Sequence, residues 1–361
     1  MNKLQIGLVG MPTAGKTTLF NLLTGNLQPT GPGGGDDVHT GSAIVPDLRI
    51  DFLAALYKPK KTIYARIEFK DIPGVRMDDS RARASKMLDE VRSADALVQV
   101  LRVFNDPAVD AIAGKPAPYR DLTDYGTELL LADMDVLEKR IARIEADPKG
   151  KKDAPAQVAL LQKLLTALEN EQMLSTIELS EPEKELLAGQ SFLSEKPLFL
   201  VVNIDETQLR EGSYPDQEKI ASYAAERKIP LIEVCARAEM EISLLLPEER
   251  LEFMEDLGLT ESGLGRLSRM AYERLNLISF FTVGEDEVRA WTINSGTTAR
   301  QAAGKIHSDI ERGFIRAEIF HYDHLHELGT AARVREAGHF RLEGKEYPVV
   351  DGDIINFRFN V

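Results

Sequence analysis

The sequence predicts an α/β protein with a helical insert and a second, smaller α+β domain. Three observations support this fold class. Apolar strand-like runs alternate with helical segments near the N-terminus, which indicates a mostly parallel sheet covered by helices. A segment with helical spacing then interrupts this alternation, and residues 279–361 combine one helix with several short strands.

The predicted sheet is built from apolar runs that are short enough for strands. Two of them, 197–203 and 230–235, are almost entirely apolar, as is typical of strands buried on both faces. They follow the interruption, so we expect the sheet to resume there. The predicted strands are residues 4–9, 62–69, 96–104, 197–203 and 230–235.

The interruption, residues 125–195, predicts an antiparallel helical hairpin. Apolar residues recur at intervals of four and three on both sides of a polar break at 146–153: Leu130, Met134, Leu137, Ile141 and Ile144 before it, and Val158, Leu161, Leu165 and Leu168 after it. The alternative is a segment packed into the main domain. The break carries Lys149, Lys151 and Lys152, which form either a solvated turn or a contact with a partner.

The C-terminal segment predicts a small α+β domain of ubiquitin-like size without an obvious catalytic set. A half-buried strand at 287–293 precedes a helix that Thr298 can cap, and short strands follow at 315–320, 346–350 and 354–359. The expected organisation is therefore a main domain in two parts, 1–124 and 196–278, around the insert 125–195, followed by the domain 279–361.

Composition limits the classes of partner and the compartment. A formal charge of −14 argues against broad adhesion to nucleic acid and leaves only local basic patches for such contacts. The chain has one cysteine, Cys235, no long apolar window and no leader-like N-terminus, so we expect a cytoplasmic protein with no membrane contact. We also expect a monomer.

Residues 10–17 match the phosphate-loop pattern G-x-x-x-x-G-K-[ST] between an apolar strand and a helix. Backbone N–H groups of such a loop converge on the β-phosphate of a nucleoside triphosphate. Lys16 adds a positive charge there, and Thr17 offers a hydroxyl to Mg²⁺. The predicted phosphate-binding residues are Thr13, Ala14, Gly15, Lys16, Thr17 and Thr18.

Asp71-Ile72-Pro73-Gly74 follows the third predicted strand directly. In this D-x-x-G arrangement the acid supports Mg²⁺ and the glycine meets the γ-phosphate. After a phosphate loop the motif indicates the GTPase-like branch of such proteins, in which the following segment senses the nucleotide. We therefore assign the catalytic roles to Lys16, Thr17, Asp71 and Gly74.

The next predicted strand ends in Asn203-Ile204-Asp205-Glu206, where GTPases carry N-K-x-D. The missing lysine and the longer acid remove the usual clamp for guanine, whereas an asparagine can pair with N6 and N7 of adenine. We therefore favour ATP, with Asn203, Ile204 and Glu206 at the base and Cys235 and Ala236 at its edge. The alternative for Asn203 is a turn residue after the strand.

Together these motifs resemble the Obg-like ATPase (YchF) family along nearly the whole chain. The resemblance also rests on residues 127–133 (Thr-Glu-Leu-Leu-Leu-Ala-Asp), on 289–292 (Arg-Ala-Trp-Thr), on 313–318 (Gly-Phe-Ile-Arg-Ala-Glu) and on 357–361 (Phe-Arg-Phe-Asn-Val). It implies a projecting coiled coil, a C-terminal β-grasp domain of the TGS type, ATP preference, and association with ribosomes and translation.

The chain departs from the family at several positions. Thr13 replaces the usual asparagine of the loop, Gly35 aligns with the Mg²⁺-closing threonine of the first switch, and the segment after Gly74 is charged instead of glycine-rich. Thr40 is the nearest substitute for that threonine, and it is otherwise a plain loop residue. Val75 stands where many GTPases carry a water-orienting glutamine.

The leading hypothesis is a slow ATPase that works as a conformational switch. Catalysis would depend on Mg²⁺, Lys16 and backbone donors, completed by a partner or by K⁺, as the resemblance implies. The alternatives are a nucleotide-sensing module that does not hydrolyse, favoured by the lost threonine, and a GTPase in which Glu206 replaces the usual aspartate.

Two further features carry less weight. His321, Asp323, His324 and His326 form a dense cluster, but alternating positions on a strand face opposite sides, which argues against a metal site. Lys58, Lys60, Lys61 and Arg66 form the best basic patch of the first domain, either as solvated charges or as a contact for ribosomal RNA.

Overall fold

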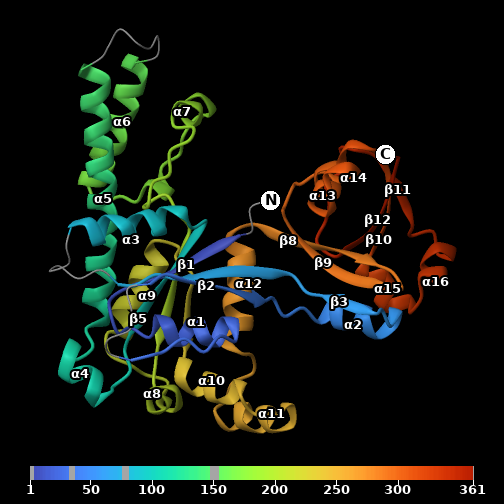
Figure 1. The fold of residues 1–361 in the computed structure, drawn as a ribbon, viewed down its shortest axis with the longest axis horizontal. Helices are drawn as coiled ribbons and strands as arrows, with labels where there is room; N and C mark the ends of the chain where they lie inside the picture. The colour runs from blue at the N-terminus through green and yellow to red at the C-terminus, as the bar shows by residue number, and fades with distance from the viewer. Residues whose placement is uncertain (1–3, 32–36, 75–80, 147–153, 361) are drawn as a thin grey trace. The chain divides into compact units, whose positions relative to one another are not determined.

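The computed structural model describes residues 4–31, 37–74, 81–146 and 154–360 (Figure 1). The chain divides into two compact units. The phosphate-loop unit comprises Leu4–Gly41 and Glu68–Gly263, and the C-terminal unit comprises Ser42–Ile67 and Leu264–Val361. No helix among the described residues is both long enough and apolar enough to cross a membrane.

A six-stranded sheet in the order β2-β4-β1-β5-β6-β7 forms the centre of the phosphate-loop unit. The five strands from β4 to β7 pair in parallel, and every residue of β5 is buried, as expected of a sheet with helices on both faces. The strands are β1 (Gln5–Val9), β2 (His39–Ile44), β4 (Arg66–Asp71), β5 (Ala96–Arg102), β6 (Leu198–Asn203) and β7 (Leu231–Val234).

Helices follow most of these strands, which confirms the predicted α/β fold. They are α1 (Lys16–Thr24), α3 (Arg81–Ser93), α4 (Pro107–Ala113), α5 (Pro118–Ala146), α6 (Ala154–Glu169), α7 (Glu181–Leu186), α8 (Glu206–Glu211), α9 (Gln217–Glu226), α10 (Ala236–Ser243) and α11 (Pro247–Asp256), with a 3-10 turn at Leu174–Thr176. Helix α12 (Gly263–Arg274) begins at the end of the unit.

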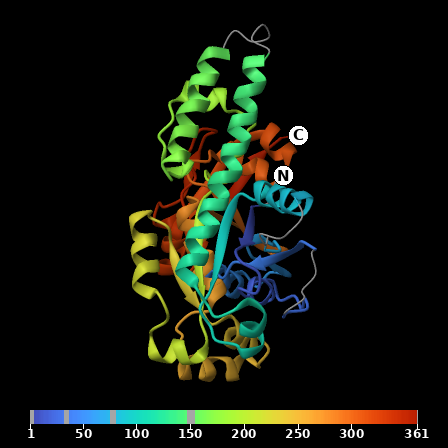
Figure 2. The same ribbon diagram turned by 90° about the vertical axis from the view of Figure 1, so that its left-hand side faces the viewer.

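The predicted hairpin is present as α5 and α6, which run side by side in Figures 1 and 2. Its apolar residues form their own core, with Leu137, Leu161 and Leu164 almost fully buried. Part of the segment also packs into the main domain, which was the alternative to a free hairpin. Helix α5 begins at Pro118, and its first turns pack on the sheet through Leu122 and Leu129. The lysines predicted at the tip lie outside the described residues.

A buried carboxylate fixes the chain where it returns from the hairpin to the sheet. Asp133 on α5 is fully buried and accepts hydrogen bonds from the N–H groups of Leu193 (2.9 Å) and Ser194 (2.8 Å) and from the Ser194 hydroxyl (2.7 Å). These bonds compensate the burial of the charge. They set the entry of the chain into β6, which ends at the site described below.

The C-terminal unit has a mixed six-stranded sheet in the order β11-β10-β12-β8-β9-β3. The strands are β3 (Lys61–Ile63), β8 (Leu277–Val283), β9 (Glu287–Asn294), β10 (Phe314–His321), β11 (Arg341–Glu343) and β12 (Asp353–Phe359). Its other helices are α2 (Leu48–Tyr57), α13 (Ala299–Ile306), α14 (Ser308–Arg312), α15 (Tyr322–Leu328) and α16 (Ala331–Glu336). The predicted strand at 346–350 is wrong, because the segment forms only one bridge, between Thr298 and Pro348.

The boundaries of the compact units lie at other positions than the predicted domain limits at 124, 195 and 278. Residues 42–67 pack with the C-terminal sheet: β3 pairs in parallel with β9, and Arg49 on α2 forms an ion pair with Asp351 (2.6 Å). The predicted strand 62–69 is therefore divided between two sheets, with Ile63 ending β3 and Arg66 beginning β4. A short-range pattern cannot report which sheet a strand joins, because pairing depends on distant partners.

Candidate nucleotide-binding site

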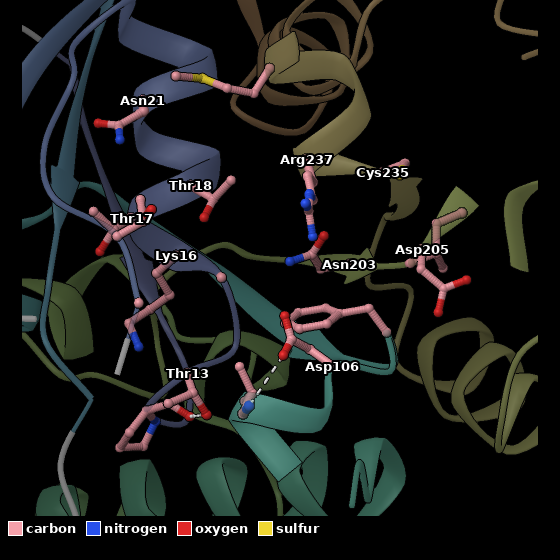
Figure 3. Close-up of a pocket in the computed structure, with 18 of the residues that line it drawn as sticks. Thr13, Lys16, Thr17, Thr18, Asn21, Asp106, Asn203, Asp205, Cys235 and Arg237 are labelled. Atoms are coloured by element: carbon pink, nitrogen blue, oxygen red, sulfur yellow. Dashed lines mark hydrogen bonds between the residues drawn. The ribbon is translucent and has the colours of Figure 1, made fainter. Parts of the chain in front are cut away.

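A pocket of about 1570 Å³ lies at the carboxyl ends of β1, β4, β5, β6 and β7 (Figure 3). This is where parallel α/β sheets bind ligands, because the loops that leave adjacent strands converge there. All of its lining residues belong to the phosphate-loop unit. They include Thr13, Gly15, Lys16, Thr17, Thr18, Asp71, Gly74, Asn203, Ile204, Glu206 and Cys235 of the predicted site.

Two glycines of the phosphate loop, and one that packs against it, are required for steric reasons. Gly10 has φ +127°, and a Cβ there would lie 2.6 Å from the Val100 carbonyl oxygen. Gly15 has φ +91°, and its Cβ would overlap the amide nitrogen of Asn203. Gly74 lies against the loop, where a Cβ would be 2.6 Å from the Pro12 nitrogen. Thr13 takes the left-handed conformation, φ 64°, without being glycine.

The Lys16 side chain is buried and turned onto its own loop. Its Nζ donates to the carbonyl oxygens of Gly10 (3.0 Å) and Met11 (2.9 Å). Burial lowers the pKa of Lys16 to about 8, and the nearby Asp71 carboxylate opposes part of this shift. The ammonium group is therefore poorly solvated, and an incoming polyphosphate would provide the compensation that the carbonyls supply only in part.

Thr17 and Asp71 form the candidate Mg²⁺ site. The Thr17 hydroxyl donates to Asp71 Oδ2 at 2.7 Å, which confirms that the first turn of α1 meets the end of β4. A hydroxyl and a carboxylate are hard oxygen ligands, and Mg²⁺ commonly takes one or two from the protein and fills the remaining positions with water and phosphate. The residues present thus fit this ion.

The structure does not bring Thr40 to the site. Thr40 lies on β2, is exposed, and is not among the residues that line the pocket, although Asp37 and His39 are. The side chain predicted to replace the Mg²⁺-closing threonine is therefore outside reach in this conformation. Gly35 and Val75, which entered the same prediction, lie outside the described residues.

Asn203 forms a brace, that is, a hydrogen-bonded link, between the phosphate loop and the start of α10. Its Nδ2 donates to the Ala14 carbonyl (3.0 Å), and its Oδ1 accepts from the Ala236 N–H (3.3 Å). Because these bonds occupy the amide oxygen and one of its N–H groups, pairing with adenine would compete with them. The base role of Asn203 stays a prediction, whereas its bracing role, which links Ala14 and Ala236, follows from the contacts.

The remaining predicted base residues differ in accessibility. Ile204 lines the pocket but is buried in an apolar cluster, and Glu206 begins α8 with its side chain exposed. Between them Asp205 caps α8 by accepting from the Gln208 N–H (2.9 Å). Burial raises the pKa of the Cys235 thiol to about 11, which agrees with a packing role and argues against a nucleophile.

Residues that follow β5 also line the pocket, although the sequence did not predict them there. Phe104 and Asp106 line the pocket, as do Arg237 and Met240 of α10. Phe104 lies beside Gly15, and the Arg102 guanidinium lies 5.2 Å from the centre of its ring. The position of Phe104 and Asp106 could have been predicted, because β5 is central in a parallel sheet. The residues after the carboxyl end of such a strand face the edge where ligands bind.

The clustered C-terminal histidines make structural contacts. Among the described residues no group of three or more His, Cys, Asp or Glu side chains could hold a metal ion. His321 instead caps α15, with Nδ1 accepting from the Asp323 N–H (3.3 Å) and Nε2 hydrogen-bonded to the Asp351 carbonyl oxygen (2.8 Å).

Comparisons with known proteins agree with this geometry. A family model described as "50S ribosome-binding GTPase" matches residues 5–130, and the model YchF-GTPase_C, described as a protein of unknown function, matches 277–360. The chain is 42% identical to the ribosome-binding ATPase YchF of Bacillus subtilis over 99% of its own length and 100% of the relative's. The chain belongs to the YchF family.

Two further members show how far the likeness extends. YchF of Escherichia coli O157:H7 is 42% identical over 99% of both chains. The solved structure of the Schizosaccharomyces pombe YchF GTPase superposes with a TM-score of 0.87 at 32% identity, covering 99% of this chain and 98% of the other. The YchF fold, including the GTPase-type domain and the C-terminal TGS-like domain, is therefore shared along the whole chain.

Proposed function

We propose that this YchF protein binds ATP with Mg²⁺, hydrolyses it slowly and uses the nucleotide state to control its association with the ribosome. One observation carries the proposal. Lys16, Thr17 and Asp71 meet in one pocket, with the Thr17 hydroxyl 2.7 Å from the Asp71 carboxylate and the Lys16 ammonium on the loop carbonyls. The names of the bacterial relatives support both ATP hydrolysis and the ribosome as partner.

Each residue of the site would make a different contact with the triphosphate or its Mg²⁺. Lys16 would exchange the Gly10 and Met11 carbonyls for phosphate oxygens, and the Gly74 N–H would donate to the γ-phosphate. Thr17 and Asp71 would hold Mg²⁺, which neutralises the charge that develops on the phosphoryl oxygens. Because Val75 cannot orient water, we expect slow turnover until a partner or K⁺ completes the site.

One observation favours the non-hydrolysing alternative. Thr40 lies outside the pocket, so Mg²⁺ would lack the ligand that closes the site in most GTPases. A GTPase is the third hypothesis. The fission yeast relative is named a GTPase, and Glu206 stands at the position of the aspartate that binds guanine in other GTPases.

Calorimetric titration with ATP, GTP and ADP in Mg²⁺, followed by single-turnover hydrolysis, distinguishes these three functions. Our proposal expects ATP to bind more tightly than GTP and to be cleaved slowly in one turnover. Tight binding without cleavage, with and without K⁺ and ribosomes, would establish the sensing module instead. Preference for GTP would establish the GTPase.

The partner is tested by sedimentation with purified ribosomal subunits. We expect co-sedimentation that differs between ATP and ADP, and its absence in both states would remove the ribosome from the proposal. A ribosomal partner would support the predicted cytoplasmic location. The monomeric state stays a prediction, which sedimentation velocity of the free protein would check.

A further inference from the structure

A second, smaller pocket of about 390 Å³ lies within the C-terminal unit, apart from the nucleotide site. Its lining side chains come from the end of β10, from α15, from the α16–β11 connection, from the start of β11, from the β11–β12 connection and from the start of β12. These side chains are His321, His324, His339, Arg341, Val350 and Asp353. Nothing in the proposed ATPase reaction uses them.

The pocket contains a buried carboxylate with one oxygen left without a hydrogen bond. Asp353 is completely buried, and its Oδ2 accepts from the Tyr347 hydroxyl (2.9 Å) and the Val350 N–H (2.9 Å). Within the part of the chain that the structure describes, no group donates a hydrogen bond to its Oδ1, and Arg341 Nη2 lies 3.7 Å away. A buried carboxylate oxygen normally has a donor, so Oδ1 is suited to a ligand that brings an N–H group.

The other side chains provide a flat face and a movable donor. The rings of His324 and His339 stack in parallel, 3.8 Å apart and inclined by 7°, and His339 is exposed. Arg341 is 46% exposed, and its Nη2 donates to the Tyr347 hydroxyl at 3.1 Å, a bond that it would exchange for an acceptor on the ligand. A flat ligand with an N–H donor next to an acceptor atom satisfies all three groups.

The near-neutral charge of the C-terminal unit permits a ligand from nucleic acid, whereas the charge of the phosphate-loop unit opposes one. Counted over residues 42–67 and 264–361, without Lys3, the C-terminal unit holds 18 Lys and Arg against 16 Asp and Glu, a formal charge of +2, and five of the six histidines. The phosphate-loop unit holds 25 against 42, a formal charge of −17. Single-stranded RNA offers bases that stack on His and Arg side chains and bond through their edges.

We propose that this pocket binds one base of single-stranded RNA, and that the base carries an exocyclic amino group beside a ring nitrogen, as cytosine and adenine do. The amino group donates to Asp353 Oδ1, Arg341 donates to the ring nitrogen, and the base stacks on His339. Uracil fits worse, because its N–H lies between two carbonyl oxygens that the carboxylate repels. This inference does not depend on ATP hydrolysis.

The test measures anisotropy of labelled tetracytidylate, tetraadenylate and tetrauridylate on the full chain at about 50 mM salt, with saturating ADP and Mg²⁺ to fill the nucleotide site. We expect the first two to bind at least about tenfold more tightly than the third. Free cytidine monophosphate distinguishes the sources of the base: equal affinity indicates a free nucleotide as the natural ligand, and weaker affinity indicates a strand. Failure of all these probes to bind would overturn the proposal.

A substitution in the pocket gives the sharper result. In Asp353→Asn the amide can keep the bonds to Tyr347 and Val350 while presenting an N–H group where Oδ1 was. We expect the base preference to reverse in favour of tetrauridylate, which a purely structural role of Asp353 would not produce. An unchanged preference in a folded Asp353→Asn protein would contradict the inference.

A second variant covers the case in which Asp353→Asn fails to fold. His339→Ala removes only an exposed ring, and the loss of base stacking should weaken binding of tetracytidylate about fivefold or more. His326→Ala is the matched control, because this histidine packs against Phe52 and Tyr322 outside the pocket. Equal affinity of the two alanine variants would exclude stacking on His339. ATP affinity, measured on the same proteins, should be unchanged.

Discussion

The two units of this chain differ in charge and in sheet geometry, and the difference separates chemistry from recognition. The unit that binds the polyphosphate is the strongly acidic one, at −17, while the C-terminal unit is close to neutral at +2. Long-range attraction therefore cannot explain phosphate binding. Charges beyond about 10 Å are screened at physiological salt, so a few buried donors at the loop decide the affinity.

Sheet geometry explains where those donors are. Parallel pairing from β4 to β7 places all strand ends that carry Asp71, Phe104, Asn203 and Cys235 on one edge, next to the phosphate loop. In the C-terminal sheet most neighbours run antiparallel, so consecutive connections alternate between its two edges. That unit presents surfaces and one small pocket instead of a convergent catalytic edge.

The largest effect should come from Lys16→Ala. We expect triphosphate affinity to fall roughly 100-fold, because a charge-assisted contact with the phosphates is lost at the loop. Folding should be retained, since the hydrogen bonds of Lys16 to other described residues go to two carbonyls of its own loop. Calorimetric titration with ATP measures the change.

Lys219→Ala is the control for net charge. It removes the same charge from the same unit, at an exposed site that pairs with Asp216 and lies outside the pocket. If both variants lost affinity equally, the charge of the unit and not the loop geometry would govern binding.

Gly15→Ala should have the next largest effect. The added Cβ would overlap the Asn203 amide at a backbone angle, φ +91°, that disfavours side chains. We expect ATP affinity to fall at least about tenfold as the brace to Ala14 is displaced.

Gly212→Ala is the control that distinguishes backbone strain at positive φ from steric overlap with Asn203. Gly212 also has positive φ, +64°, but its Cβ would meet no atom within 4 Å. It should cost about 1 kcal/mol of unfolding free energy and leave ATP affinity unchanged. Similar affinities for the two alanine variants would argue against the brace.

ATP affinity should also depend on pH through Lys16. With its pKa lowered to about 8 in the empty site, the side chain loses its charge as the pH rises above 8, while bound phosphate favours the charged form. Affinity should therefore decrease above pH 8, by at most tenfold per pH unit, and Lys16→Met should lack this decrease. A flat wild-type profile between pH 7.5 and 9.5 would exclude a lowered pKa.

The same shift affects stability in the opposite direction. Between about pH 8 and the ordinary value near 10.5 the unfolded chain binds the Lys16 proton and the folded chain does not. The contribution of Lys16 to the free energy of unfolding of the empty protein should therefore rise with pH across this window. Urea titrations of wild type and Lys16→Met at pH 8 and 10 compare the two slopes.

Base choice should respond moderately to Glu206→Asp. The shorter acid restores the acceptor geometry for guanine at an exposed position, so the ratio of ATP to GTP affinity should fall about tenfold. Adding Ile204→Lys would bury a charge in the apolar cluster around β6, so the single variant is the cleaner test. An unchanged ratio would mean that other residues of the pocket read the base.

The smallest effect concerns the surface charges. Changing Lys58, Lys60 and Lys61 of the C-terminal unit to Glu should weaken ribosome binding a few-fold and reduce its salt dependence. The equivalent triple change at Lys139, Lys163 and Lys184 of the phosphate-loop unit should do less, because that unit is already strongly acidic. Sedimentation at several salt concentrations compares them, and equal losses would contradict the division of roles.

The sequence by itself determined the features that depend on neighbouring residues. The phosphate loop, the acid at the end of β4, the hairpin periodicity and the cap at Thr298 are local patterns, and the structure contains each of them. Their chemistry follows from residue type and spacing, because a glycine, a lysine and a hydroxyl within a few residues have only a few ways to meet a phosphate.

Tertiary structure alone decided the features that join distant segments. It assigned residues 42–67 to the C-terminal sheet, left Thr40 outside the pocket, committed Asn203 to Ala14 and Ala236, and placed Asp353 beneath Arg341 with one oxygen unbonded. Strand pairing and buried hydrogen bonds depend on which surfaces meet in the folded chain. A local pattern carries no information about those partners, so they could not be read before the fold was known.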